Sequence, residues 1–297
     1  MPVGEFSVLA SSFAWAASNI VAKTARTARA LHVSVVHSWL ALAVVLVVTL
    51  SIGRFDDMLR TPWQAALLLG LGASLGTLGN IAFFTAVTRG EVGRTFTTTT
   101  SLNVLFSIMA GWLALDEPIA GATWVGAAAI LGGVYIVNRR RELAGAPSTS
   151  PAARGRGFTP GVFALAVFAA GMWSIGLIAT KIGLRDTDVF TGAVLRNLVP
   201  AIAYLSIAWI SPTIRLTGVP RADLKRLAIS ALFFVGSLLG WTFALQRSDA
   251  SITAILSATS PVFAYLLAVA FLKEKVRIQV IGGIVLSLAG VLLILGS

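Results

Sequence analysis

Apolar runs of about 20 residues recur along almost the whole chain, and this pattern constrains the fold more than any other feature. A run of this length is what an α-helix needs to cross the ~30 Å hydrocarbon core of a membrane. Alternating strands of about ten residues, the signature of a membrane barrel, do not appear, so the runs predict helices. We place ten membrane-spanning helices at 4–22, 33–53, 63–88, 95–115, 119–138, 160–180, 189–210, 227–246, 251–272 and 277–296.

Composition leaves no room for a sizeable soluble domain. Of the 297 residues, 57% are hydrophobic and 12% are charged, whereas roughly a quarter of an average soluble protein is charged. The N-terminus lacks the basic segment of a secretory signal, so we expect the first helix to be retained. The chain has no cysteine, which excludes disulfides, thiol catalysis and cysteine metal sites. We therefore expect an all-α membrane protein with neither a cofactor nor a metal.

The distribution of basic residues predicts the orientation of the helices. The loops after the first, third, fifth, seventh and ninth helices carry 17 Lys and Arg, and the other loops carry 5. The positive-inside rule places the basic loops in the cytoplasm and both termini outside. Membrane orientation thus accounts for the net charge of +11, and we expect no nucleic-acid partner. The expected location is a bacterial inner (plasma) membrane, crossed many times.

A polar, basic segment divides the chain into two halves, 1–138 and 160–297. Residues 139–159 are rich in helix breakers, which predicts a flexible cytoplasmic linker; a site for lipid headgroups is the alternative. Across this linker FAWAASNIVAKTA (13–25) aligns with GMWSIGLIATKIG (171–183). Two copies of a segment with an odd number of crossings must be inverted relative to one another. Secondary transporters share this arrangement, with substrate sites near the bilayer midplane.

The stretch 244–294 carries motifs of a known family. It combines Ser260-Pro261 in the ninth helix with Glu274 at the following turn and a glycine-rich last helix. This pattern resembles the EamA-type repeat of the drug/metabolite transporter superfamily. The first half resembles it through Glu117, but Asn103-Val104 stands where the proline would be.

The resemblance covers both halves and implies a transporter, not an enzyme, for amino acids, nucleobases, sugar phosphates or toxic organic compounds. Arg196 is similar to the family's Arg in the seventh helix, and the tryptophans of the first, sixth and eighth helices resemble those of aromatic amino-acid exporters. Ten-helix members are usually drawn with cytoplasmic termini, which disagrees with the charge distribution. We retain the orientation that the charges predict.

Polar and aromatic residues inside the predicted helices indicate a substrate site, because such groups are costly in lipid and tend to face a cavity or another helix. Ser11, Trp15 and Ser18 share one stripe of the first helix. Trp15, Trp173 and Trp241 suit a planar or cationic substrate, although Trp15 also fits a membrane-interface anchor. The candidate substrate-binding residues are Trp15, Asn19, His37, Asn80, Ser101, Asn103, Trp173, Arg196, Trp241, Thr259, Ser260 and Pro261.

Several of these residues also have a purely structural interpretation. Pro261 frees a backbone carbonyl that can bind substrate, or merely kinks the helix. His37 is the candidate for proton coupling, with helix packing as the alternative, since all twelve carboxylates lie in loops or at span ends. Glu117 and Glu274 are expected to cap or pair at their turns. The glycine pairs of 72–76 and 236–240 are expected to pack helices closely.

These observations predict a secondary transporter that exports small metabolites by alternating access around a central cavity. Amino acids or related compounds are the favoured substrates. A sugar-phosphate or nucleotide-sugar exchanger is the alternative; it would need Lys or Arg in the cavity, where only Lys23, Lys181 and Arg196 qualify. A membrane-embedded transferase is a third possibility, disfavoured by two His, no Cys and no intramembrane acid. The expected partners are a small-molecule substrate and the lipid bilayer, and we expect a monomer.

Overall fold

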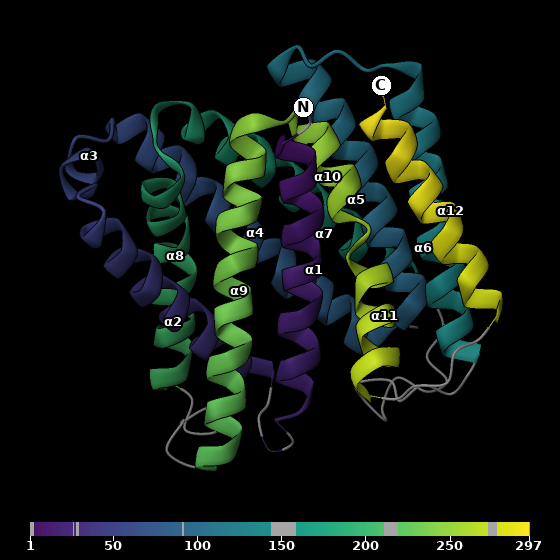
Figure 1. Ribbon diagram of the computed structural model, residues 1–297, viewed down its shortest axis with the longest axis horizontal. Helices are drawn as coiled ribbons and strands as arrows, with labels where there is room; N and C mark the ends of the chain where they lie inside the picture. Colours follow the sequence, from purple (N-terminus) through teal and green to yellow (C-terminus); the bar gives the residue numbers. More distant parts are fainter. Residues whose placement is uncertain are drawn as a thin grey trace.

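The computed structural model is a bundle of helices (Figure 1). It describes residues 3–25, 27, 30–90, 92–143, 159–210, 219–272 and 278–296, which contain no β-strand. The helices are α1 (Val3–Lys23), α2 (Ala30–Ser51), α3 (Phe55–Leu59), α4 (Trp63–Arg89), α5 (Val92–Leu115), α6 (Gly121–Leu143), α7 (Pro160–Gly183), the 3-10 turn η2 (Leu184–Asp186), α8 (Val189–Ile210), α9 (Arg221–Arg247), α10 (Ala250–Ser257), α11 (Ser260–Leu272) and α12 (Ile278–Leu295).

Seven helical segments of the described residues are long and apolar enough to cross a membrane. They are His32–Ser51, Trp63–Val87, Thr95–Leu115, Pro160–Asp186, Val189–Ile207, Arg221–Arg247 and Ala250–Phe271. Two shorter apolar stretches, Gly121–Ile136 and Ile281–Leu295, belong to α6 and α12. The protein is therefore a multi-pass membrane protein.

Helix breakers explain where the observed helices differ from the predicted spans. The predicted span 251–272 is divided into α10 and α11, which meet just before Pro261; proline lacks the amide hydrogen that a continuous helix needs. The matching place in the first half, Asn103-Val104, lies within the uninterrupted α5. α6 continues to Leu143, into the predicted linker, since the first breaker is Gly145. The rest of that linker, 144–158, and Glu274 lie outside the described residues.

The two halves are interleaved, since the main helix pairs join one helix from each half. α1 lies against α9, α4 against α7, α2 against α8, and α6 against α12. The α1–α9 pair is antiparallel: Ser7 Oγ donates to the carbonyl oxygen of Gly240 and Ser11 Oγ to that of Ser237, each at 2.8 Å. Both termini lie at the same end of the bundle (Figure 1). We call this the outer end and the opposite end the inner end, after the predicted orientation.

Glycines bring the backbones of α6 and α12 together. A Cβ at Gly290 would stand 2.6 Å from the carbonyl oxygen of Gly126, and a Cβ at Gly283 would stand 2.7 Å from that of Gly133. Such positions tolerate only glycine, and they permit the close approach that helix association in lipid depends on. The two contacts run in opposite directions along the helices, so α6 and α12 are antiparallel.

The predicted packing glycines of the other helices are confirmed in part. A Cβ at Gly72 on α4 would stand 2.7 Å from the carbonyl oxygen of Gly176 on α7. At Gly76 and Gly236, however, a Cβ would meet nothing within 4 Å. The prediction was therefore wrong for Gly236, where the space would accept a side chain, whereas the Gly76 backbone lies close to α7, with its nitrogen 3.4 Å from a Cβ built at Gly176.

Replacing Gly283 by alanine should weaken the α6–α12 contact. The added methyl group collides with the Gly133 carbonyl oxygen, and overpacking of this kind typically costs about 1–3 kcal/mol. Gly282→Ala is the matched control, because a Cβ there meets nothing within 4 Å and alanine favours a helix by roughly 1 kcal/mol over glycine. Thermal unfolding in detergent should show a lower Tm for Gly283→Ala alone; equal Tm values would contradict the packing role.

Candidate functional site

One cluster of predicted site residues joins α4, α5 and α7 inside the bundle. Trp173 Nε1 donates a hydrogen bond to Asn80 Oδ1 at 3.1 Å, and the Trp173 ring lies 5.3 Å from the Phe83 ring. The next residue, Ser174, has its Oγ 3.1 Å from Asn103 Oδ1. These side chains are half-buried, except for the buried Ser174. The structure thus brings Asn80, Asn103 and Trp173 together.

Tyr204 on α8 extends this cluster, and the sequence analysis missed it. Its hydroxyl lies near the polar side chains of Asn80 and of Ser34 on α2. Asn80 therefore links the tryptophan of α7 to the tyrosine of α8. A tyrosine inside an apolar span was the available signal, since a hydroxyl held in lipid needs a partner.

His37 lies in a second cluster, formed by α1, α2 and α9. Its Nε2 is 2.8 Å from Ser230 Oγ, and the Ser230 hydroxyl donates to the carbonyl oxygen of Ser18 at 2.7 Å. Because the hydroxyl hydrogen is committed to Ser18, Ser230 accepts from His37, and Nε2 must carry a hydrogen. Phe234 stacks on the imidazole with ring centroids 5.0 Å apart. Of the two roles left open for His37, these contacts support helix packing.

The stripe predicted on α1 is divided between two environments. Trp15 is 43% exposed and its ring lies 5.8 Å from that of Phe234, while Asn19 Nδ2 donates to the Trp15 carbonyl oxygen of its own helix. Ser11 and Ser18 are instead buried against α9. All three residues of the predicted stripe therefore face α9, and the role of that face as an inner surface stays a prediction.

The matching spacing of serines was a signal for this helix contact. Ser11 and Ser18 on α1 are seven residues apart, as are Ser230 and Ser237 on α9, and the pairs meet in antiparallel order. Small residues at a seven-residue spacing fall on one helix face and favour association in lipid.

Arg196 on α8 carries the most unusual charge inside the bundle. Its guanidinium carbon lies 4.0 Å from the centroid of the Trp241 ring. Its Nη1 is buried and has no hydrogen-bond partner among the described residues. A buried cation is costly unless an anion accompanies it, and a cation–π contact offsets only part of that cost. The position is therefore suited to an anionic group that the described side chains do not supply.

The break before Pro261 is satisfied by its own side chains. Proline cannot donate to the carbonyl oxygen of Ser257, but Ser260 Oγ does so at 2.7 Å. Thr259 Oγ1 likewise donates to the carbonyl oxygen of Leu256 at 2.6 Å. The predicted free carbonyl oxygen thus already accepts one hydrogen bond, and of the two roles left open for Pro261 this supports the kink.

Two pockets lie away from most predicted site residues. One, of about 250 Å³, opens at the outer end and is lined by Arg54, Asp57, Arg60, Thr61, Asp186, Thr187 and Asp188. The other, of about 60 Å³, lies beside Thr259 between α1, α11 and α12. Ser101 is half-buried midway along α5. Trp15, Trp173 and Trp241 each contact a different neighbour, in three separate clusters.

Replacing Asn80 by alanine should lower the free energy of unfolding, because it removes the hydrogen bond to Trp173. In Asn80→Ala the indole N–H loses its acceptor, and an unsatisfied buried donor costs about 1–3 kcal/mol. Trp173→Phe removes the donor as well, so the double variant should lose less stability than the two single variants together. Asn19→Ala is the control, because that amide bonds only within its own helix. If the double variant lost as much unfolding free energy as the two single variants added together, Asn80 and Trp173 would not be coupled.

Comparison with known proteins identifies the fold and the family. The EamA-like transporter family matches residues 2–139 and 160–296. A solved structure titled "Crystal structure of protein" shares the fold, with a TM-score of 0.78 and 18% sequence identity over 98% of this chain and 96% of that one. No curated protein matches the chain. Since the family match takes in nearly all of both halves, the chain belongs to the EamA-like transporter family.

Proposed function

We propose that this membrane transporter exports amino acids or related small carboxylates. The observation that carries the proposal is the Arg196 guanidinium, which lies on the Trp241 ring and whose buried Nη1 has no partner in the part of the chain that the structure describes. An ionisable group inside a membrane segment points to function by default. A carboxylate would complete this site through charge-assisted hydrogen bonds, while the tryptophan face offers a surface for an apolar or aromatic side chain.

The number of available cations favours a carboxylate over a phosphate ester. Lys181 Nζ donates to the carbonyl oxygens of Leu245 and Ser248, at 2.7 and 2.5 Å, so two of its three N–H donors are already used within the protein. Lys23 is exposed at the last residue of α1. Arg196 then faces the substrate as a single positive charge, which balances one carboxylate better than the two negative charges of a phosphate ester.

Alternating access of two inverted halves is the proposed mechanism. We take α1, α6 and α12 as crossings beside the seven longer segments, with α10 and α11 as one crossing, which makes ten. Helices at matching places in the two halves run antiparallel, as the Gly126–Gly290 and Gly133–Gly283 contacts of α6 and α12 illustrate. Inverted repeats of this kind permit one half to rock against the other around a central site.

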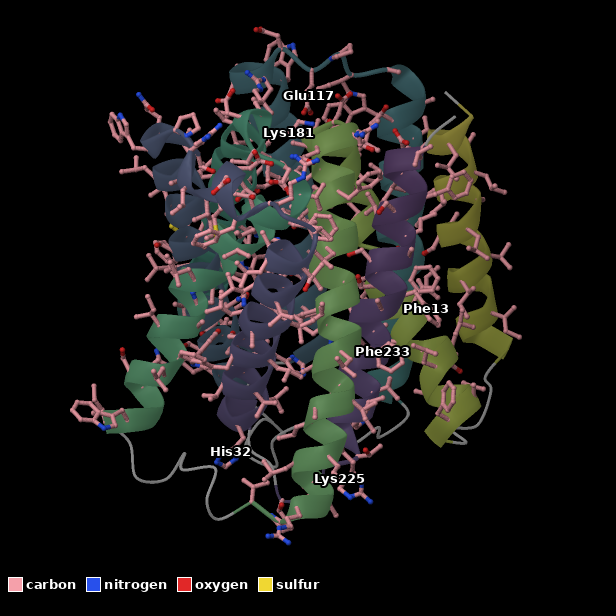
Figure 2. The ribbon with its side chains drawn as sticks, turned by 60° about the vertical axis from the view of Figure 1, so that its left-hand side comes forward. Phe13, His32, Glu117, Lys181, Lys225 and Phe233 are labelled. Atoms are coloured by element: carbon pink, nitrogen blue, oxygen red, sulfur yellow. The ribbon has the colours of Figure 1, made fainter. Side chains whose placement is uncertain are left out.

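The orientation and location belong to the same proposal. Both termini lie at one end (Figure 1), and the start of α9, with Arg221, Lys225 and Arg226, lies at the other (Figure 2). Basic residues favour the cytoplasmic side, so we place the termini outside, in a bacterial plasma membrane. One chain holds the whole site, and we propose that it works as a monomer.

Neutralising Arg196 should impair transport of carboxylates. In liposomes that contain the purified protein, Arg196→Gln should raise KM for a labelled amino acid such as tryptophan by about tenfold to a hundredfold, the effect of losing ~1.4–3 kcal/mol of charge-assisted bonding. Arg196→Lys should retain part of the affinity, because the charge remains but the planar stacking is lost. Lys23→Gln is the control for a charge at the end of a span.

The substrate class is tested in the same liposomes with tryptophan, its decarboxylated amine tryptamine, and glucose 6-phosphate. Saturable flux of tryptophan alone, sensitive to Arg196→Gln, is the expected result. Saturable flux of the amine, or no saturable flux of any amino acid in a wider panel, would refute the carboxylate proposal. Flux of the phosphate ester would favour the exchanger instead.

A further inference from the structure

We infer that two polar contacts between the halves, one at each end of the bundle, are the gates of the transport cycle. This inference rests on the proposed alternating access. The outer latch consists of Glu117 with Ala250 and Ser251. The inner latch consists of Asp223 and Arg226 with Thr24 and Thr27. Figure 2 shows Glu117 at one end of the bundle and Lys225, between Asp223 and Arg226 on α9, at the other.

The outer latch is a buried carboxylate of the first half that holds the start of a helix of the second. Glu117 Oε1 accepts from the amide of Ala250 at 2.5 Å. Its Oε2 accepts from the amide of Ser251 at 3.0 Å and from Ser251 Oγ at 2.7 Å. The first amides of a helix lack partners within it and favour a negative charge, and the residue before α10, Asp249, makes no side-chain cap bond. Glu117 therefore caps a helix, but one of the opposite half and not at its own turn as predicted.

The end of α5 aims this carboxylate inward. Asp116 has a positive φ of 53°, and the amide of Glu117 donates to the carbonyl oxygen of Gly111 at 3.2 Å. This turn ends the helix and folds the chain back along it. The Glu117 carboxylate then occupies the place where a side chain at Gly111 would be.

A lysine and a second carboxylate surround the outer latch. Lys181 donates to the carbonyl oxygens of Leu245 and Ser248 at the end of α9. The α9–α10 connection is therefore held at its carbonyl groups by Lys181 and at its amide groups by Glu117. Burial, and the neighbouring Glu117 carboxylate, raise the pKa of Asp249. The charges of Glu117, Asp249 and Lys181 thus influence one another across the boundary between the halves.

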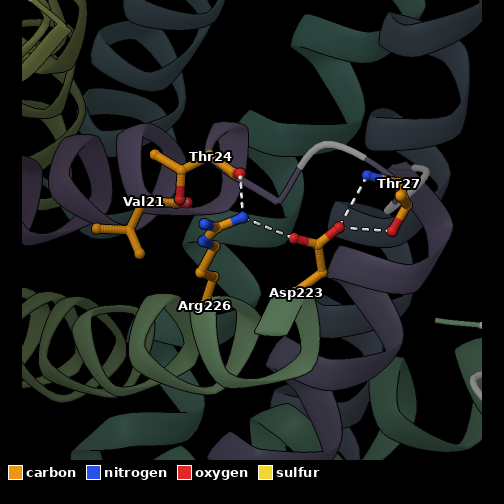
Figure 3. Close-up of polar contacts among 5 residues, drawn as sticks. All are labelled: Val21, Thr24, Thr27, Asp223 and Arg226. Atoms are coloured by element: carbon orange, nitrogen blue, oxygen red, sulfur yellow. Dashed lines mark hydrogen bonds and ion pairs between the residues drawn. The ribbon is translucent and has the colours of Figure 1, made fainter. Parts of the chain in front are cut away.

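The inner latch ties the α1–α2 connection of the first half to the first turn of α9. Asp223 Oδ2 accepts from the amide of Thr27 at 2.9 Å and from its hydroxyl at 2.5 Å (Figure 3). Arg226 Nη1 donates to Asp223 Oδ1 at 2.8 Å and to the carbonyl oxygen of Thr24 at 3.1 Å. The Asp223 side chain is 6% exposed. As at the outer end, a buried carboxylate of one element holds the backbone of the opposite half.

Both latches have the properties that a gate needs. They lie at the ends of the bundle, where water can take over the hydrogen bonds of separated groups, so opening one exchanges protein partners for solvent. Contacts nearer the middle, such as Ser11 with Ser237, are buried, and breaking them inside a membrane is costly because no water is at hand to replace the partner. The described structure has both latches engaged, and each half of the cycle would release one of them.

Directional accessibility tests this inference without a known substrate. The chain has no cysteine, so Ser101→Cys, midway along α5, is a unique reporter. Its reaction with a membrane-impermeant maleimide is measured in right-side-out and in inside-out vesicles. Glu117→Gln should raise the rate from the outer side and lower it from the inner side, each on the order of tenfold, the shift that ~1.4 kcal/mol produces. Asp223→Asn should do the reverse.

The controls remove a charge close to each latch. Asp116→Asn alters an exposed carboxylate next to Glu117 and keeps a residue type that tolerates positive φ; Lys225→Gln alters an exposed residue on the turn of Asp223. Neither should change the ratio of the two rates. The double variant Glu117→Gln with Asp223→Asn should return the ratio of outer-side to inner-side labelling toward that of the Ser101→Cys protein. Faster labelling from both sides in either single variant, or unchanged rates, would overturn the inference.

A disulfide provides a second test that does not depend on the stability of Glu117→Gln. A Cβ at Gly111 would stand 3.6 Å from that of Ser251, within the range of about 3.5–4.5 Å that a disulfide requires. In a Glu117→Ala background, Gly111→Cys with Ser251→Cys should restore slow outer-side labelling of residue 101 when oxidised and lose it on reduction. If oxidation leaves the outer-side labelling rate of residue 101 unchanged, the outer gate is refuted. Because no substrate is involved, failure of the carboxylate proposal would leave this result intact.

Discussion

Close backbone contact between helices of opposite halves is the interaction on which the rest of this structure depends. Lipid tails are as apolar as the side chains they meet, so helices associate through packing and hydrogen bonds and not through the hydrophobic effect. Gly126, Gly133, Gly283 and Gly290 supply the packing between α6 and α12, and the serines of α1 supply hydrogen bonds to α9. Neither half has this partner surface within itself. The fold is therefore an assembly of two halves, although one chain encodes it.

The pairing of helices from opposite halves places the contacts that stay intact along the helices and the contacts that can open at the ends of the bundle. Glycine and serine contacts lie along the length of the helix pairs, where no water can replace them. Charged contacts such as Glu117 with α10 and Asp223 with Thr27 lie at the ends. A transporter has to keep its halves together while it opens one end, and this distribution of contacts meets both demands. Arg196 is the exception, because it lies on a membrane-spanning helix and its buried Nη1 has no hydrogen-bond partner among the described residues.

Local physical rules account for the features that could be predicted from the sequence. The length of the apolar runs predicted the spans, and Pro261 predicted a kink in the ninth helix, where the structure divides it into α10 and α11. Neither feature depends on a distant partner. The contacts of Asn80 and Trp173 could not be predicted in this way, because the residues are far apart in the chain and meet only when α4 packs on α7.

The sequence by itself determined the helical class, the repeat and the family, because hydrophobic length, residue periodicity and motif order are properties of the chain. Only the tertiary structure decided which polar groups are already satisfied. Ser230 accepts from His37 and Lys181 is held by α9, whereas Arg196 keeps a nitrogen without a partner among the described residues. The physical reason is that a hydrogen bond requires two groups within about 3 Å at the right angle, and the order of residues does not state that distance.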